Sequence, residues 1–212
     1  MPSTYALEAC VESFAEAKLA QDLGAHQIEL CANLEVGGTT PEKALILKAK
    51  EELDLKVKVM IRPRGGNFVY NVEEIEAMKQ SILYCQSIGI DGVVFGILHK
   101  DNTLNIDQTL ILSRLAGPME VTIHRAIDDT PNILAAIQLL KNVPSVHCIL
   151  SAGQANSAVA GAQTLSTMVQ EAGDGLIVIP GGGVRKDNVQ ALHEQVGSSI
   201  YHGTKIVGPL ST

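Results

Sequence analysis

Short apolar segments alternate with longer amphipathic segments along the whole chain. Eight of the apolar segments have the length of strands, and they cover residues 5–10, 27–31, 56–61, 92–98, 120–125, 146–151, 175–179 and 199–202. Seven amphipathic segments lie between them and have the apolar spacing of helices that face a core, over residues 14–23, 41–53, 72–87, 106–115, 131–142, 157–171 and 185–195.

Residues that favour helix ends support this division. Ser13 and Asn71 are predicted N-caps, because their side-chain oxygens can accept a hydrogen bond from a free backbone N–H of the first turn. Gly24 follows the last turn of the first helix. For the second helix we expect Thr40 as the cap and Pro41 at the first helical position.

Regular alternation of strands and helices predicts parallel strands that are joined by right-handed crossovers. Eight such units predict an α/β fold of the TIM-like (β/α)8 barrel type, formed as one domain by residues 1–212. Only residues 203–212 follow the eighth strand, which is too few for a full eighth helix. We therefore expect the groove beside that strand to be bare or covered by a partner chain.

Composition limits the kinds of partner. The core must be aliphatic, because 46% of the residues are hydrophobic while only 3% are aromatic and none is Trp. A net charge of −7 argues against a nucleic-acid partner, which needs a basic surface, but a local basic cluster could still bind an acidic metabolite. No apolar run is long enough to cross a membrane and no signal peptide is evident, so we expect a cytoplasmic protein.

The carboxyl ends of the strands carry the candidate chemistry, because active sites of such barrels form there. The first two strands share one pattern, in which Glu8 precedes Cys10 and Glu29 precedes Cys31 on the same strand face. Both cysteines could be packing residues, or they could be soft ligands that select Cu(I) or Zn²⁺.

The third strand ends in Arg62-Pro63-Arg64-Gly65-Gly66, which could be an ordinary surface turn. Strand alternation places Arg62 and Arg64 on one face, where we expect them to neutralise the two buried carboxylates. Lys58 lies deeper on the same face and could serve this purpose instead.

Further candidate residues lie at the ends of the later strands: His124, Arg125, Ser151, Gly181, Gly182, Gly183 and His202. The two histidines could be core residues or members of the site. The three glycines precede a predicted helix, so they could form a tight turn or hold an anion at the helix N-terminus.

Together these motifs resemble the CutC family of copper homeostasis proteins. The resemblance extends along nearly the whole chain and rests on Glu8-x-Cys10, Glu29-Leu30-Cys31, Gly37-Gly38-Thr39-Thr40-Pro41, Ile61-Arg62-Pro63-Arg64-Gly65-Gly66, Thr122-x-His124-Arg125-Ala126, Ser151-Ala152-Gly153 and Gly181-x-Gly183-Val184-Arg185. It implies a TIM-like barrel, a cytoplasmic location, a homo-oligomer of two or more chains, and a Cu(I) site formed by the cysteines that match Cys10 and Cys31.

Two main hypotheses of function follow, and a non-catalytic sensor of an anionic metabolite is a weaker third. The resemblance favours copper homeostasis, with Cu(I) as cofactor and Cys10 and Cys31 as ligands. The alternative is a lyase or isomerase that acts on a phosphorylated or carboxylated sugar-like metabolite. In it the ligand-binding residues would be Arg62, Arg64, Arg125, Ser151, Gly181, Gly182, Gly183 and His202, and the residues that exchange protons would be Glu8, Glu29 and His124.

Overall fold

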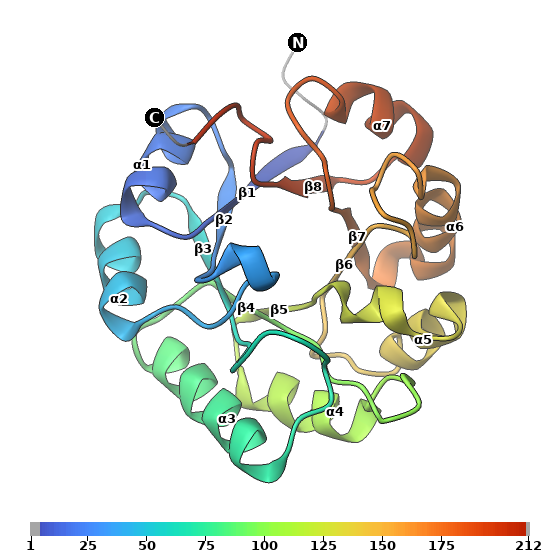
Figure 1. The fold of residues 1–212 in the computed structure, drawn as a ribbon, viewed down its shortest axis with the longest axis horizontal. Helices are drawn as coiled ribbons and strands as arrows, with labels where there is room; N and C mark the ends of the chain where they lie inside the picture. The colour runs from blue at the N-terminus through green and yellow to red at the C-terminus, as the bar shows by residue number, and fades with distance from the viewer. Residues whose placement is uncertain (1–4, 211–212) are drawn as a thin grey trace.

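A computed structural model describes residues 5–210 and shows eight parallel strands in a nearly closed barrel (Figure 1). The strands are β1 (Ala6–Val11), β2 (Gln27–Leu30), β3 (Lys56–Met60), β4 (Gly92–Phe95), β5 (Glu120–Ile123), β6 (Cys148–Ser151), β7 (Ile177–Pro180) and β8 (Ile200–Gly203). They are hydrogen-bonded in the order β7-β6-β5-β4-β3-β2-β1-β8. The two end strands meet at a seam, where the Ser198 hydroxyl before β8 donates to the Val178 carbonyl of β7. The predicted barrel is therefore confirmed.

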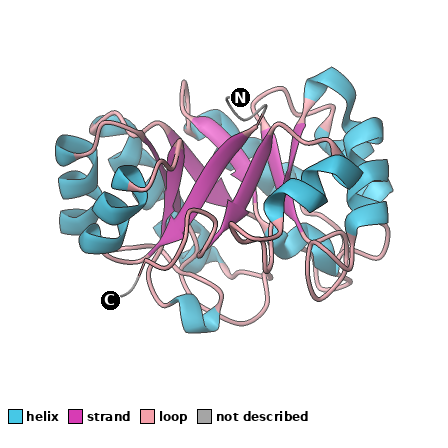
Figure 2. Cartoon of the chain, turned by 90° about the horizontal axis from the view of Figure 1, so that it is seen from above, coloured by secondary structure: helices cyan, strands magenta, loops and turns pink. Residues whose placement is uncertain are grey.

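Seven α-helices of the described residues surround the strands, as Figure 2 shows from the side. They are α1 (Phe14–Asp22), α2 (Lys43–Glu52), α3 (Val72–Ser87), α4 (Ile106–Leu115), α5 (Ile133–Leu140), α6 (Ala162–Ala172) and α7 (Val189–Val196). Short 3₁₀ helices follow β2 at Leu34–Val36, β5 at Arg125–Asp129 and α6 at Gly173–Gly175. No helix in residues 5–210 is long and apolar enough to cross a membrane.

Ser13 and Asn71 cap α1 and α3 as expected, each accepting a hydrogen bond from a backbone N–H of the first turn. The expected start of α2 is wrong, because this helix begins at Lys43 and Glu42 is its N-cap. The Thr40 hydroxyl is instead 2.8 Å from the backbone N–H of Arg62 and 3.2 Å from its carbonyl. It therefore fixes the chain that leaves β3.

The starts of α6 and α7 also differ from the sequence prediction, by about one turn each. Residues 157–161 form turns before α6. The last of them, Gly161, lies so close to the Ala152 carbonyl that any side chain would clash with that oxygen. Helix α7 begins at Val189. Just before it, the Asn188 side chain accepts a hydrogen bond from the Arg185 N–H and donates one to the Gly183 carbonyl. The glycine turn after β7 is thus separated from this helix.

The C-terminal segment covers the place of the missing eighth helix. Residues 204–210 form no helix, but they bury Ile206, Val207 and Leu210 in the main hydrophobic core. The expectation of a bare groove is therefore wrong, since this segment of the chain packs there itself, while coverage by a partner chain stays a prediction.

The apolar core is divided between two places. Its main part lies between the strands and the helices, and it is built from outward-facing residues such as Ile28, Val59 and Ile149. Within residues 5–210, the inside of the barrel contains two small apolar clusters, Cys10-Cys31-Met60-Val94 and Cys148-Leu150-Ile179. Polar and charged side chains such as Glu8, Lys58 and Thr122 are buried with them, so the barrel interior is more polar than the main core.

Candidate functional site

The carboxyl ends of the strands surround a cavity of about 110 Å³ at the barrel mouth. Its lining contains seven of the residues that the sequence singled out: Cys10, Glu29, Cys31, Arg62, His124, Arg125 and His202. Leu34, Gly37, Met60, Phe68 and Leu150 complete it. The parallel register brings the first two strands together as expected, with Cys10 paired to Glu29.

The two cysteines at the mouth are neighbours. Their Sγ atoms lie 3.9 Å apart, and Cys31 Sγ is also 3.4 Å from Glu29 Oε1, so the single S–H of Cys31 is shared between two acceptors. The hydrogen bond from Cys31, helped by His202, outweighs burial and lowers the pKa of Cys10 to about 6. The pKa of Cys31 is raised well above its usual value, first by its hydrogen bond to Cys10 and then by burial. At neutral pH the pair therefore holds one thiolate and one thiol, and a thiolate is the form that binds metals.

Glu8 lies one layer deeper and is neutralised by Lys58. The Lys58 ammonium is 3.1 Å from Glu8 Oε2 and 2.5 Å from Glu120 Oε1, and the side chains of Lys58 and Glu8 are each only 1% exposed. Gln27 donates to the same Glu8 oxygen at 2.6 Å. Burial alone would raise the pKa of Glu8, but Lys58 and then His202 lower it to about 2. Glu8 is therefore a buried carboxylate that is ionised at neutral pH.

His202 bridges the two glutamates. Its Nδ1 is 2.9 Å from Glu8 Oε1 and 3.4 Å from Glu29 Oε2. Burial opposes protonation of His202, but Glu29, Cys10 and Glu8 together raise its pKa well above 6.5. Burial raises the pKa of Glu29 itself to about 8. Oxygen and nitrogen atoms of Glu8, Glu29 and His202 lie within 4.8 Å of one another and could hold a metal ion, but a protonated His202 already supplies the positive charge there.

The expectation that Arg62 and Arg64 neutralise Glu8 and Glu29 is wrong. Arg62 donates instead to the carbonyls of Val36, Gly38 and Gly66, at 2.8–2.9 Å. Strand β3 ends at Met60, so the alternation of faces that the prediction assumed does not extend to these arginines. Lys58, which is still within the strand, is the cation that reaches Glu8.

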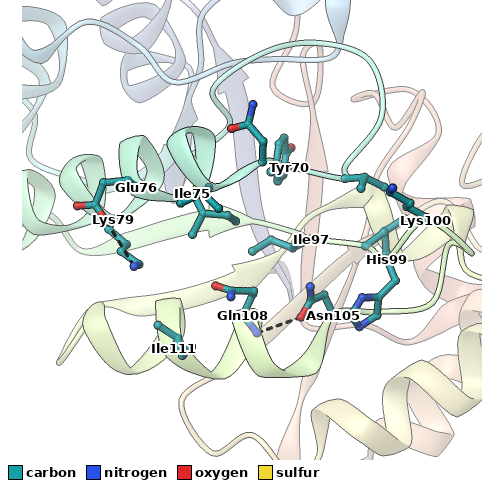
Figure 3. A pocket seen from close by; sticks show the side chains of 14 residues that line it. Tyr70, Ile75, Glu76, Lys79, Ile97, His99, Lys100, Asn105, Gln108 and Ile111 are labelled. Carbon is teal, nitrogen blue, oxygen red and sulfur yellow. Dashed lines mark hydrogen bonds and ion pairs between the residues drawn. The ribbon is translucent and has the colours of Figure 1, made fainter.

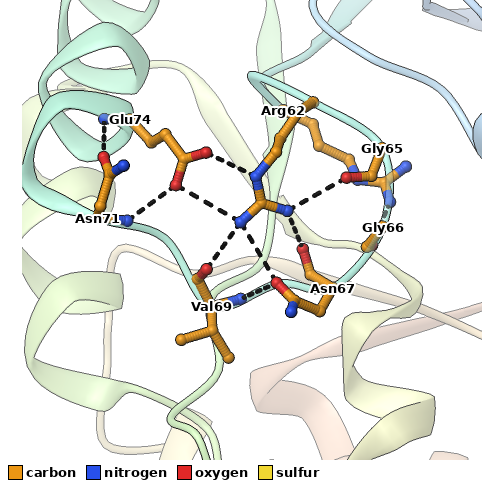
Figure 4. A network of polar contacts seen from close by, with 8 residues as sticks. Arg62, Gly65, Gly66, Asn67, Val69, Asn71 and Glu74 are labelled. Atoms are coloured by element: carbon orange, nitrogen blue, oxygen red, sulfur yellow. Dashed lines mark hydrogen bonds and ion pairs between the residues drawn. The ribbon is translucent and has the colours of Figure 1, made fainter.

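Arg64 lies outside the cavity lining and belongs to the loop that precedes α3. Its Nε is 2.5 Å from Glu74, and its Nη atoms donate to the carbonyls of Asn67 and Val69. Figure 4 labels these three partner residues, Glu74, Asn67 and Val69. Glu74 also completes a reciprocal cap with Asn71 at the start of α3. Arg64 therefore holds a loop to a helix, and its side chain is 38% exposed.

Asp128, which sequence reasoning missed, organises the opposite side of the mouth. It accepts hydrogen bonds from Arg125 Nε at 2.9 Å, from the Ser151 hydroxyl at 2.5 Å and from the Ala152 N–H at 3.0 Å. Its position in the 3₁₀ helix that starts at Arg125 was the available signal, since i and i+3 residues lie on one side of such a helix. Ser151 is fully buried and does not line the cavity.

The three glycines after β7 form a turn beside Arg125 and do not line the cavity. Gly182 and Gly183 have φ angles of +94° and +73°, which favour glycine, and a Cβ on Gly182 would lie 3.3 Å from Arg125 Nη1. Gly181 donates its N–H to the Ser151 carbonyl. Because α7 starts only at Val189, no helix N-terminus directly follows this turn, and anion binding there stays an untested expectation.

A larger hollow lies outside the barrel, between α3 and α4 (Figure 3). Its volume is about 430 Å³, and Ile75, Ile97, His99, Asn105 and Gln108 are among the residues that line it. None of the site residues proposed from the sequence borders it. The mouth cavity is therefore the place where the candidate chemistry is concentrated.

Comparisons with known proteins agree with the motifs. The model of the CutC family matches residues 5–207. A CutC protein of Chromobacterium violaceum is 41% identical over 200 residues, which cover 93% of this chain and 80% of the relative. The human copper homeostasis protein cutC homolog is 36% identical over 93% of this chain and 72% of its own length.

Solved structures give the same result. The crystal structure of a CutC protein from Streptococcus agalactiae superposes with a TM-score of 0.91 at 31% identity, over 95% of this chain and 99% of that one. Deoxyribose phosphate aldolase from Aeropyrum pernix superposes with a TM-score of 0.69 at 15% identity, over 96% of this chain and 87% of its own, which shows a shared barrel fold alone.

Proposed function

Because the chain belongs to the CutC family, whose members include proteins named for copper homeostasis, we propose that it binds one Cu(I) ion between Cys10 and Cys31. The observation that carries this proposal is the 3.9 Å separation of two buried sulfur atoms that line the mouth cavity. Thiolates are soft ligands that select Cu(I) over the hard cations of the cell. A cytoplasmic location, where thiols stay reduced, fits this chemistry.

The sulfur separation fits a bent site better than a linear one. With metal–thiolate bonds of roughly 2.3 Å, as Zn²⁺ makes, a linear arrangement would need sulfurs about 4.6 Å apart. The observed 3.9 Å corresponds to an S–metal–S angle of about 116° at the same bond length. The pair can therefore bind the ion without moving apart, and it leaves one side of the ion open to a third ligand.

His202 is the residue best placed to be that third ligand. Its side chain is hydrogen-bonded to Cys10, and its Nδ1 lies 2.9 Å from Glu8, which fixes the ring. In metal sites, a carboxylate commonly accepts a hydrogen bond from the ligating imidazole and so fixes its orientation. Ligands must be deprotonated to bind a metal, so uptake of the ion would release protons from Cys31 and His202.

The lyase or isomerase hypothesis has less support from the geometry. Two of the residues assigned to substrate binding, Arg64 and Ser151, are bonded to Glu74 and Asp128 and do not line the cavity. Glu8, one of the three residues proposed to exchange protons, is bonded to Lys58 and Gln27 and does not line the cavity.

X-ray absorption at the copper edge tests the proposed coordination. For protein loaded anaerobically with one equivalent of Cu(I), we expect two sulfur neighbours at roughly 2.3 Å and one nitrogen neighbour. The His202→Asn variant should lose the nitrogen neighbour and keep both sulfurs. A first shell of nitrogen and oxygen atoms only would contradict binding by the cysteine pair.

A further inference from the structure

Arg62 is a buried cation whose charge has no counterpart. Its residue is 4% exposed, and three of its five N–H groups donate to backbone carbonyls. The Tyr70 side chain nearby is neutral as well, because burial raises its pKa. No carboxylate within residues 5–210 forms an ion pair with Arg62, whereas buried Lys58 has two. Buried charges are ordinarily paired, so this exception indicates a missing anion.

His124 presents a second unused donor at the same cavity. Its Nδ1 accepts a hydrogen bond from the Ala126 N–H at 3.2 Å, so the proton of the neutral imidazole is on Nε2. Burial and the charge of Arg62 lower the pKa of His124 to about 3, which keeps the ring neutral. Nε2 is buried and has no hydrogen-bond partner among the described residues. A buried N–H without an acceptor is costly, which again points to an absent ligand.

Phe68 contacts both donors. Its ring centroid lies 4.8 Å from the guanidinium carbon of Arg62 and 4.8 Å from the centroid of the His124 ring. All three side chains line the mouth cavity. At Gly37, which also lines it, a Cβ would lie 3.2 Å from Arg62 Nη1, so the absence of a side chain keeps this side open.

The cavity is small. Its volume is about 110 Å³, against about 430 Å³ for the hollow between α3 and α4, so a small ligand fits it best. Arg125 at the rim adds a second positive charge, although Asp128 offsets it. A carboxylate of two or three carbons meets these limits, because it is planar, singly charged and able to accept two hydrogen bonds.

We propose that the mouth cavity is a binding site for a small carboxylate, whose charge is balanced by Arg62 and whose oxygen accepts the Nε2–H of His124. The site does not use the thiols of Cys10 and Cys31. It therefore does not depend on the copper proposal, although a bound carboxylate would lie in the same cavity as the metal site.

Thermal unfolding in sodium acetate tests this site against a neutral molecule of equal size. At constant ionic strength, maintained with sodium chloride, acetate is expected to raise the Tm in a saturable way, because a ligand that binds only the native state stabilises it. Acetamide has the same shape without the charge and should give no saturable rise. Equal effects of acetate and acetamide, or no saturable effect of acetate, would overturn the proposal.

Two substitutions of His124 separate its donor from its structural bond. In His124→Asn the side-chain oxygen can replace Nδ1 as acceptor for the Ala126 N–H, but the cavity donor is lost, so acetate affinity should fall about tenfold or more. In His124→Gln the side-chain N–H₂ can replace Nε2, so most of the acetate affinity should remain. The variant Cys85→Ala, which changes a buried cysteine that does not line the cavity, should respond to acetate as the unaltered protein does. An unchanged acetate affinity in His124→Asn would refute the assignment of this donor.

Discussion

Replacing Lys58 by Met is expected to lower the free energy of unfolding by about 3–5 kcal/mol, the usual cost of leaving a buried charge without its partner. Lys58 lies 3.1 Å from Glu8 and 2.5 Å from Glu120, and its side chain is 1% exposed. Met has a similar length and fills the same space, so the loss would come from the charge and not from a cavity. Urea denaturation at pH 7, followed by circular dichroism, measures the change.

A matched control is Lys50→Met, which breaks the Lys50–Asp91 pair at 3.3 Å, where both side chains are about one third exposed. Such a partly exposed pair contributes about 0–1 kcal/mol, so this variant should stay close to the unaltered protein. Adding Glu8→Gln to Lys58→Met should recover part of the lost stability. A Lys58→Met protein as stable as Lys50→Met would show that the barrel interior does not depend on this ion pair.

The same pair predicts how stability depends on pH. The pKa of Glu8 falls from its usual 4.5 to about 2 in the folded protein. A depressed carboxyl pKa stabilises the folded state above pH 4.5, and this contribution is lost as the pH falls towards 2. The Glu8→Gln variant should therefore lose less stability than the unaltered protein between pH 5 and pH 3, as measured by urea midpoints.

Loss of either thiol at the mouth is expected to weaken Cu(I) binding more than about 10–100-fold, which is the typical cost of losing a residue that only orients a metal ligand. Cys10→Ser or Cys31→Ser replaces a soft sulfur by a hard oxygen, so the ion is left with a single sulfur ligand. Anaerobic titration against a coloured Cu(I) chelator measures the affinity.

Cys85 and Cys148 supply the control, because both are buried away from the mouth cavity. Burial raises the pKa of Cys85 to about 12 and also raises that of Cys148, so neither is a thiolate at neutral pH. Cys85→Ala and Cys148→Ala should keep the full Cu(I) affinity. If they weakened Cu(I) binding as much as the mouth variants do, the copper site would not be at Cys10 and Cys31.

The order of strands and helices was predictable because it rests on local patterns. Each apolar run and each helix cap depends on a few neighbouring residues. The repeated Glu-x-Cys pattern placed Cys10 beside Glu29 once the first two strands were taken as neighbours. Helix starts were harder: the α2 prediction failed because the Thr40 hydroxyl bonds the backbone of a residue 22 positions away.

Partners of the charged residues were the part that sequence reasoning could not supply. Arg62 binds backbone carbonyls, which every residue has and which no sequence pattern distinguishes. Asp128 was missed because its three partners come from two segments that meet only in the folded barrel. The expected homo-oligomer stays a prediction.

The most direct test of the proposed copper site is an anomalous difference map at the copper absorption edge, from crystals of the protein loaded with Cu(I) without oxygen. We predict one strong peak per chain, within roughly 2.3 Å of both Cys10 Sγ and Cys31 Sγ. A map whose copper peaks lie only at other residues, with the two sulfurs still 3.9 Å apart and no density between them, would contradict the proposal.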